Sequence, residues 1–204
     1  MIDDTRRPAG RRPRIASGLM FLVLLASPGA SFARERTSDQ GSAPILGETT
    51  ADWPEHSRIL VGALVEKYGI PNRLNAVQAI WYDNGPWLKT VVHRDSWSSF
   101  WGIRDESILE QSIEYRVPHD KIAILRRFGK KIQFDDARGE LSAKSENEGL
   151  NYLALNLADE IIAGKRSVKD ALAFYRATQD LAKAGKSSPY LEGFMFARED
   201  RGGD

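Results

Sequence analysis

His93 and Asp95 are the side chains whose types and spacing could support acid–base chemistry. Residues two apart on a strand point to the same face, so the Asp95 carboxylate could orient the His93 imidazole as a general base. Glu110, on another predicted strand, is the alternative orienting group. A His-Arg-Asp string is also an ordinary polar strand end, and the sequence names neither a nucleophile nor an oxyanion site. We therefore assign no catalytic residue and keep His93 and Asp95 as candidates only.

The chain has three histidines, His56, His93 and His119, and no cysteine. The histidines are far apart and show no His-Glu-x-x-His spacing, so the sequence predicts no metal site. It also contains no phosphate-binding loop, no dinucleotide glycine fingerprint and no Gly-x-Ser-x-Gly elbow. The sequence therefore predicts no cofactor.

Four of the five tryptophans lie in one short segment, at positions 81, 87, 97 and 101. Indole rings can stack on sugars or apolar ligands, and their one polar edge lets them border a wet pocket. The same rings pack well as cross-strand pairs in a hairpin core, which is the default expectation. Trp81, Trp87 and Trp101 remain candidates for a ligand-stacking surface.

Asn147 and Asn151 project into the apolar arc of a predicted helix. At about 100° per residue, that arc is formed by Leu150, Leu153, Ala154, Leu157, Ala158 and Ile161. A buried amide without partners costs about 1–3 kcal/mol, so both side chains must find hydrogen bonds. Either they bind backbone and fix the helix register, or they are the polar contacts of a ligand pocket between helix and sheet.

Strands and hairpins must position these candidates. Residues 76–95 predict a hairpin that turns at Asp83-Asn84-Gly85-Pro86. Residues 109–117 alternate, which predicts a half-buried strand with one polar exception, Gln111, on its apolar face. The expected solvent face of that strand consists of Glu110, Ser112, Glu114 and Arg116. A second hairpin is predicted around residues 137–139.

Helices are expected after Ser57, between Pro118 and Gly129, and in two stretches that end at Gly164 and Gly185. Capping boxes are predicted for the last two, at Ser145 with Glu148 and at Ser167 with Asp170. The short link between them favours an antiparallel helical hairpin at the C-terminus. The sequence therefore predicts a single α+β domain, with an antiparallel sheet of about five strands packed against helices.

The first 33 residues have the pattern of a secretory signal peptide. Five arginines precede the apolar run "IASGLMFLVLLA", and small residues flank Phe32 before an expected cleavage after Ala33. We expect a flexible linker over residues 34–52, the domain over 53–196 and a disordered tail over 197–204. The protein is thus expected to be exported, either periplasmic or secreted, with no stable membrane span after cleavage.

Removal of the signal also changes the charge. Residues 1–33 hold five Arg and two Asp, which leaves 24 basic and 26 acidic residues in the mature chain. A nearly neutral domain gives no electrostatic reason to bind nucleic acid. Without cysteine, neither a lipoprotein anchor nor a disulfide can form.

The stretches "GPWLKTVVHRD", "LEQSIEYRVP", "GELSAKS" and "NYLALNLADEIIAGKRSVKDA" together resemble a family of exported bacterial proteins of unknown function. The resemblance extends over residues 53–196. It implies export and a single domain, and it implies no activity, ligand or catalytic residue.

Three functions remain open from the sequence. The leading hypothesis is a non-catalytic domain of the cell envelope that binds a small molecule or an envelope protein. The second is an envelope hydrolase with His93 as general base and Asp95 or Glu110 as its orienting group. The third is a structural or assembly factor of the envelope, for which a large exposed apolar patch would be the marker.

Overall fold

Six antiparallel strands form one sheet in the order β1-β2-β3-β4-β6-β5. They are β1 (Arg73–Leu74), β2 (Gln78–Asn84), β3 (Trp87–His93), β4 (Leu109–Glu114), β5 (Ile132–Asp135) and β6 (Glu140–Ser145). The predicted α+β class with an antiparallel sheet is confirmed. The sixth strand is β1, whose two residues pair with β2 and are too few to show any periodicity in the sequence.

The structure is a computed structural model that describes residues 42–96, 107–129 and 132–197. These residues all belong to one compact unit of the chain, which runs from residue 37 to residue 204. The predicted signal peptide over residues 1–33, Trp101 and nearly all of the predicted tail over 197–204 lie outside the described residues.

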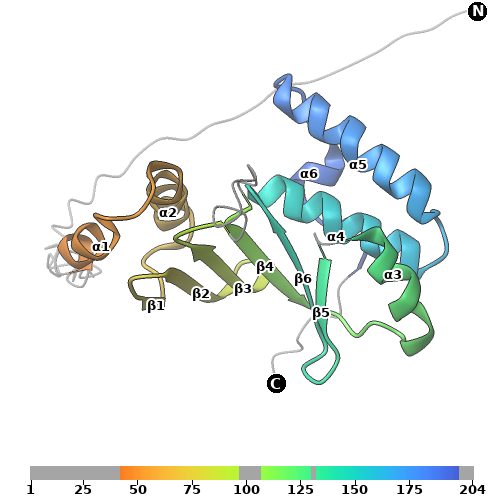
Figure 1. Ribbon diagram of the computed structural model, residues 1–204, viewed down its shortest axis with the longest axis horizontal. Helices are drawn as coiled ribbons and strands as arrows, with labels where there is room; N and C mark the ends of the chain where they lie inside the picture. The colour runs from red at the N-terminus through yellow and green to blue at the C-terminus, as the bar shows by residue number, and fades with distance from the viewer. Residues whose placement is uncertain (1–41, 97–106, 130–131, 198–204) are drawn as a thin grey trace, which may run out of the picture. The chain divides into compact units, whose positions relative to one another are not determined.

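Helices cover one face of the sheet. They are α1 (Ser42–Thr50), α2 (Glu55–Tyr68), the 3-10 turn η2 (His119–Lys121), α3 (Ile122–Phe128), α4 (Glu148–Ile162), α5 (Val168–Lys183) and α6 (Pro189–Glu192). In Figure 1, α2 stands over β2 and β3, whereas α4 stands over β4 and β6. The helices α3, α5 and α6 pack against α4, so the predicted C-terminal helical hairpin is formed by α4 and α5.

Helix α1 corrects the predicted flexible linker for residues 42–50, whereas residues 34–41 lie outside the described residues. Its Leu46 packs against the buried cluster beneath α2, and Thr50 Oγ1 donates to the Leu46 carbonyl at 2.8 Å. The sequence offers only Ile45-Leu46 as an apolar spot, which is too little to show a helical period. Tertiary packing, rather than local pattern, is what most often stabilises so short a helix.

Strand β4 is shorter than the predicted 109–117. It ends at Glu114 because its partner β6 begins at Glu140, with which Glu114 pairs. Ser112, expected on a solvent face, is only 1% exposed. The strand is therefore covered on both faces near its centre.

The β2–β3 hairpin turns at Gly85-Pro86, with Asn84 paired to Trp87. Asp83 just before the turn has a φ of 48°, in the left-handed region that non-glycine residues rarely adopt. Strict alternation would place Asn84 on the same face as Tyr82. The positive φ breaks the alternation, and the Asn84 side chain turns to the helix side, where it binds Thr90.

Two clusters of buried side chains fill the space between helices and sheet. The cluster beneath α2 contains Trp53, Val61, Leu64, Ala79, Trp81, Val92, Ile108 and Leu109. The larger cluster surrounds α4 and includes Trp87, Ile113, Leu141, Leu153 and Leu157. Tyr68, the last residue of α2, packs against both clusters and so marks the boundary between them.

The segment that contains α6 returns over α4 and is held by one buried side chain, Asn156. Its Nδ2 donates to the carbonyls of Tyr190 and Gly193, and its Oδ1 accepts from Met195 N at 2.7 Å. Asn156 is only 1% exposed and uses both ends of its amide. We call residues 189–196 the C-terminal strap.

The outer edge of β2 is only partly covered by β1. Beyond the end of β1, Asn72 Oδ1 accepts a hydrogen bond from Tyr82 N at 2.8 Å. A side chain thus takes the place that a longer neighbouring strand would otherwise occupy.

Candidate functional site

Asn151 is fully buried on the sheet-facing side of α4. Its Nδ2 donates to Gln111 Oε1 at 3.0 Å and to the Leu109 carbonyl at 3.3 Å. Both partners belong to β4, so this amide fixes the position of α4 on the sheet. Its Oδ1 has no hydrogen-bond partner.

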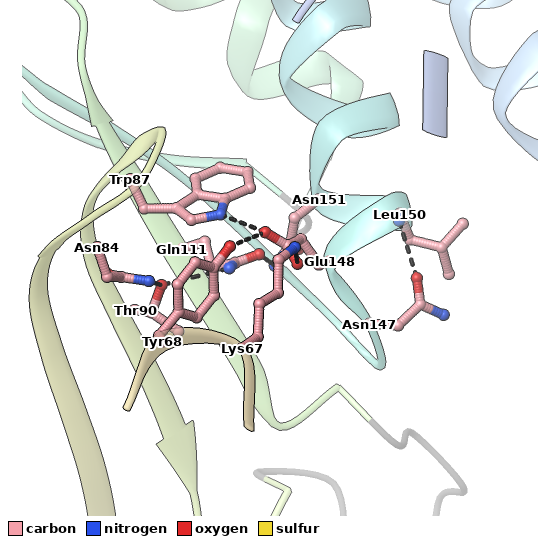
Figure 2. A network of polar contacts seen from close by, with 10 residues as sticks. All are labelled: Lys67, Tyr68, Asn84, Trp87, Thr90, Gln111, Asn147, Glu148, Leu150 and Asn151. Atoms are coloured by element: carbon pink, nitrogen blue, oxygen red, sulfur yellow. Dashed lines mark hydrogen bonds and ion pairs between the residues drawn. The ribbon is translucent and has the colours of Figure 1, made fainter. Parts of the chain in front are cut away.

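Hydrogen bonds between neutral polar side chains extend this contact beyond Gln111. Gln111 Nε2 donates to Thr90 Oγ1 at 3.3 Å, and Asn84 Nδ2 donates to the same oxygen at 2.9 Å. Figure 2 shows these hydrogen bonds running from the β2–β3 hairpin across β4 to α4. Such a network is stable only where its members bind one another, so it ties strands and helix into one arrangement.

Asn147 does not join Asn151, which corrects the prediction that both lie in the apolar arc of the helix. Asn147 is exposed and precedes α4 in an extended conformation, where its Oδ1 accepts from Leu150 N at 3.0 Å. It is therefore the N-cap residue, a role that the sequence assigned to Ser145. Ser145 Oγ instead donates to the Asn147 carbonyl at 2.7 Å. Because α4 begins at Glu148, Asn147 precedes the helix and is not part of its apolar arc.

Trp81 and Trp87 are each 1% exposed, so both rings lie in the core. The Trp81 indole donates to the Gly69 carbonyl at 2.8 Å. The Trp87 ring lies 4.7 Å from the Tyr152 ring and 5.2 Å from the Phe194 ring, measured between centroids. With their polar edges bound and their faces packed, neither ring presents a surface for stacking.

Glu148, the first residue of α4, joins α2 to α4 and to the hairpin. Its carboxylate accepts from Lys67 Nζ at 2.6 Å, Tyr68 OH at 2.5 Å and Trp87 Nε1 at 2.6 Å. Figure 2 shows these three donors converging on it from the C-terminal end of α2 and from β3. In the sequence, Glu148 is recognisable only as part of a capping box, because its partners are far away along the chain.

The contacts of Glu148 shift the pKa values of Glu148 and Tyr68. Burial raises the pKa of the Glu148 carboxyl, but the hydrogen bonds from Lys67, Tyr68 and Trp87 outweigh burial, and the pKa lies below its ordinary value. For Tyr68, burial together with the hydrogen bond and charge of Glu148 raises the pKa well above the ordinary tyrosine value. The pair is therefore an ionised carboxylate bound by a neutral phenol at neutral pH.

His93 pairs with Glu110 across β3 and β4. His93 Nε2 lies 3.2 Å from Glu110 Oε2, and the two side chains are 28% and 21% exposed. The hydrogen bond with His93 lowers the pKa of Glu110, although burial opposes this shift. Of the two carboxylates expected to orient His93, Glu110 is the one in contact.

Asp95 lies beyond the end of β3 and is not on the strand that would have aligned it with His93. Its Oδ2 lies 3.4 Å from Arg94 Nε, and its side chain is 45% exposed. The expected alternation fails here because the strand stops at His93.

We call the face of the sheet opposite the helices the open face, because no helix covers it in the part of the chain that the structure describes (Figure 1). Gln111 points to α4, so its neighbours Glu110 and Ser112 point to the open face. Their cross-strand partners Val91 and Lys89 share that face, as do His93 and Tyr82 by alternation. Tyr82 is 41% exposed, the largest ring that this face offers to solvent.

No protein-family model, no curated protein and no solved structure matches this chain. Within residues 42–96, 107–129 and 132–197, no group of three or more His, Cys, Asp or Glu side chains is placed to hold a metal ion. In the same ranges no helix combines the length and the hydropathy needed to cross a membrane.

Proposed function

We propose that this chain is a non-catalytic binding domain of the bacterial cell envelope, and that it receives its ligand on the open face of the sheet. The observation that carries the proposal is the pair that His93 forms with Glu110 on that face. His93 Nε2 and Glu110 Oε2 lie 3.2 Å apart, and both side chains are partly exposed. The pair offers hydrogen-bonding atoms in fixed positions, which favours binding because little ordering remains to be done.

The distribution of side chains supports the choice of face. On the helix side, Asn151, Trp81 and Trp87 are buried and engaged with sheet, backbone or carboxylate. A ligand there would have to displace core packing. On the open face, Tyr82, Lys89, His93 and Glu110 are at least partly exposed, whereas Val91 and Ser112 are buried.

Export remains part of the proposal and rests on the N-terminal sequence pattern. Arginines precede an apolar run that ends with small residues before position 34, as in signal peptides. Fractionation of the host, with an antibody against residues 34–204, is the test. A mature chain found outside the cytoplasm supports export, whereas a full-length cytoplasmic chain contradicts it.

Native mass spectrometry tests the binding function. Residues 34–204, purified gently from the exported fraction of the host, should carry a reproducible added mass. The mass should be lost in Tyr82→Ala and kept in Lys169→Ala, an exposed control on α5. A bare chain in the wild type, or equal retention in both variants, contradicts the proposed binding face.

The His93–Glu110 contact favours a second candidate, an envelope hydrolase with His93 as general base and Glu110 as orienting group. General base catalysis contributes about 10²–10⁴ in rate. Hydrolysis of purified envelope polymers should therefore fall about 100-fold or more in His93→Ala and be unchanged in His56→Ala, an exposed control on α2. Equal rates for the wild type and His93→Ala would remove this candidate.

A further inference from the structure

One line of polar side chains crosses the open face from strand to strand. The register pairs Tyr82 with Lys89, Lys89 with Ser112, Ser112 with Ser142, and Ser142 with Gln133. The line thus uses one residue from each of β2, β3, β4, β6 and β5, and we call it the polar row. Neighbouring strands are about 4.8 Å apart, so the row is roughly 19 Å long.

We propose that the ligand of the open face is a polysaccharide chain that lies along the polar row, across the strands. This inference rests on the proposed binding function and names its ligand class. The row offers hydroxyl, amide and ammonium groups, and it has an exposed tyrosine ring at one end. The hydroxyls of a sugar can bind the hydroxyl, amide and ammonium groups of the row. The apolar face of the sugar ring can stack on the tyrosine ring.

Charge on the row favours a hydroxyl-rich ligand over a strongly charged polymer. The one cation of the row, Lys89, lies 3.7 Å from Glu140 Oε2. Glu110, which lies two residues before Ser112 on β4, is paired with His93. Lys144, the register partner of Glu110, is a second lysine on this face. A nucleic acid chain needs several cations to neutralise its phosphates, whereas an acidic side chain lies beside each of these two lysines.

Ser112, at the centre of the row, provides an independent observation in favour of a ligand here. Its side chain is 1% exposed, and its Oγ has no hydrogen-bond partner. Buried hydroxyls are nearly always bonded, so an unbonded one calls for an explanation. A ligand hydroxyl placed over β4 would supply the absent partner.

The ion pair between Lys89 and Glu140 can open to admit a ligand. Strand β4 lies between β3 and β6, so the ion pair between Lys89 on β3 and Glu140 on β6 must cross over β4 near Ser112. Both side chains are long and partly exposed, at 26% and 20%. Partly exposed pairs of this kind add little stability, so a ligand can separate Lys89 from Glu140 and reach the hydroxyl.

An extended peptide fits this geometry less well. Peptides that recognise sheets add a strand along an edge and use backbone hydrogen bonds. The polar row runs across the strands and presents side chains only. It therefore suits a polymer whose own repeating groups form hydrogen bonds.

Co-sedimentation with insoluble polysaccharides tests the proposal. The mature chain, residues 34–204, would be mixed with protein-free peptidoglycan, chitin or cellulose, and the bound fraction would be measured against polymer concentration. The wild type should sediment with at least one of them. Tyr82→Ala should weaken binding about tenfold, through loss of the stacking ring.

Ser112→Ala is the more selective variant. It removes an unbonded hydroxyl, so the midpoint of urea unfolding should stay the same or rise, whereas binding should fall about fivefold. Ser187→Ala, an exposed control after α5 whose hydroxyl donates to Glu192, should leave polysaccharide binding unchanged. Unchanged binding in both Tyr82→Ala and Ser112→Ala, with the wild type bound, would place the polysaccharide elsewhere and overturn the proposal.

The two proposals fail in different ways. If no polysaccharide sediments the chain but native mass spectrometry shows an added mass that Tyr82→Ala abolishes, the open face binds another ligand and only the polysaccharide assignment is wrong. An added mass that is a polypeptide has the same meaning. If the chain binds nothing in either experiment, both proposals are wrong.

Discussion

At the scale of single residues, the buried amide of Asn151 is the best-defined contact between helix and sheet. It donates to Gln111 Oε1 and to the Leu109 carbonyl, and it is fully excluded from solvent. The change in stability when the amide is removed depends on the buried acceptors, such as Gln111 Oε1, that lose their donor. An acceptor that stays buried without a donor costs more than the hydrogen bond itself contributes.

Asn151→Leu should therefore lower the free energy of unfolding by about 1–3 kcal/mol, because Gln111 Oε1 is left without a donor. Urea unfolding followed by tryptophan fluorescence measures the change. The double variant Gln111→Leu, Asn151→Leu removes both partners and should lose less than the sum of the two single variants. A single variant as stable as the wild type would show that Asn151 is not needed to hold α4 to the sheet.

The sequence indicates part of this contact chain. Gln111 is the one polar residue on the apolar face of its predicted strand, and Asn151 lies in the apolar arc of its helix. Asn84 could not be predicted, since it reaches Thr90 only because the positive φ of Asp83 breaks the strand alternation. Asn147 was misassigned because the exact start of a helix depends on its capping contact.

At the scale of elements, Glu148 connects two helices that otherwise rest on separate buried clusters. Three donors, from Lys67 and Tyr68 on α2 and from Trp87 on β3, meet its carboxylate at the start of α4. The position is favourable for a negative charge, because the free N–H groups of the first helical turn lie beside it.

This contact should make stability depend on pH in the acidic range. The folded-state pKa of Glu148 lies below that of the unfolded chain. Its contribution is thus complete above the unfolded value of about 4.3 and is lost as pH falls through the folded pKa. Glu148→Gln should be less stable than the wild type by about 1–2 kcal/mol at pH 7, and the difference should shrink toward pH 3.

Urea unfolding at several pH values checks this dependence. Glu66→Gln, an exposed position on α2, is the matched control and should follow the wild type at every pH. A stability difference between Glu148→Gln and the wild type that stays constant from pH 7 to pH 3 would contradict the role assigned to the ionised carboxylate.

Elements with strong local signals were predicted from the sequence, and elements that depend on packing were not. Ser167 caps α5 as expected, by accepting from Asp170 N at 3.1 Å, and Gly129 follows α3. By contrast α1 and β1 have too few apolar residues to show a period, and each exists through contacts with the rest of the fold. The contact of Tyr68 with Glu148 joins residues 80 positions apart, which no local pattern predicts.

At the scale of the whole molecule, the C-terminal strap closes the fold over α4. Asn156 binds three backbone groups of the strap. Phe194 of the strap packs against Trp87 and Tyr152. Gly149 adds a close approach, because a Cβ there would lie 3.2 Å from the Leu191 carbonyl. The strap therefore packs against the core of the fold, although it lies near the C-terminal end of the chain.

Asn156→Ala should release the strap, because three backbone groups lose their partners at once. We expect a stability loss of about 1–3 kcal/mol and faster proteolysis within residues 189–196 than elsewhere. Limited proteolysis with mass mapping measures this, with Gln179→Ala on α5 as a control amide that binds Glu146 instead. Equal cleavage rates in Asn156→Ala and the wild type would show that the aromatic contacts alone hold the strap.

The contact between Asn72 and Tyr82 N occupies a backbone group at the outer edge of β2. An exposed strand edge presents unpaired N–H and C=O groups on which a second chain can add a strand, and repeated addition leads to aggregates. Here β1 pairs with only two residues of β2, and the Asn72 side chain takes the next N–H along that edge. One amide thus removes an N–H group to which the backbone of a second chain could otherwise bind.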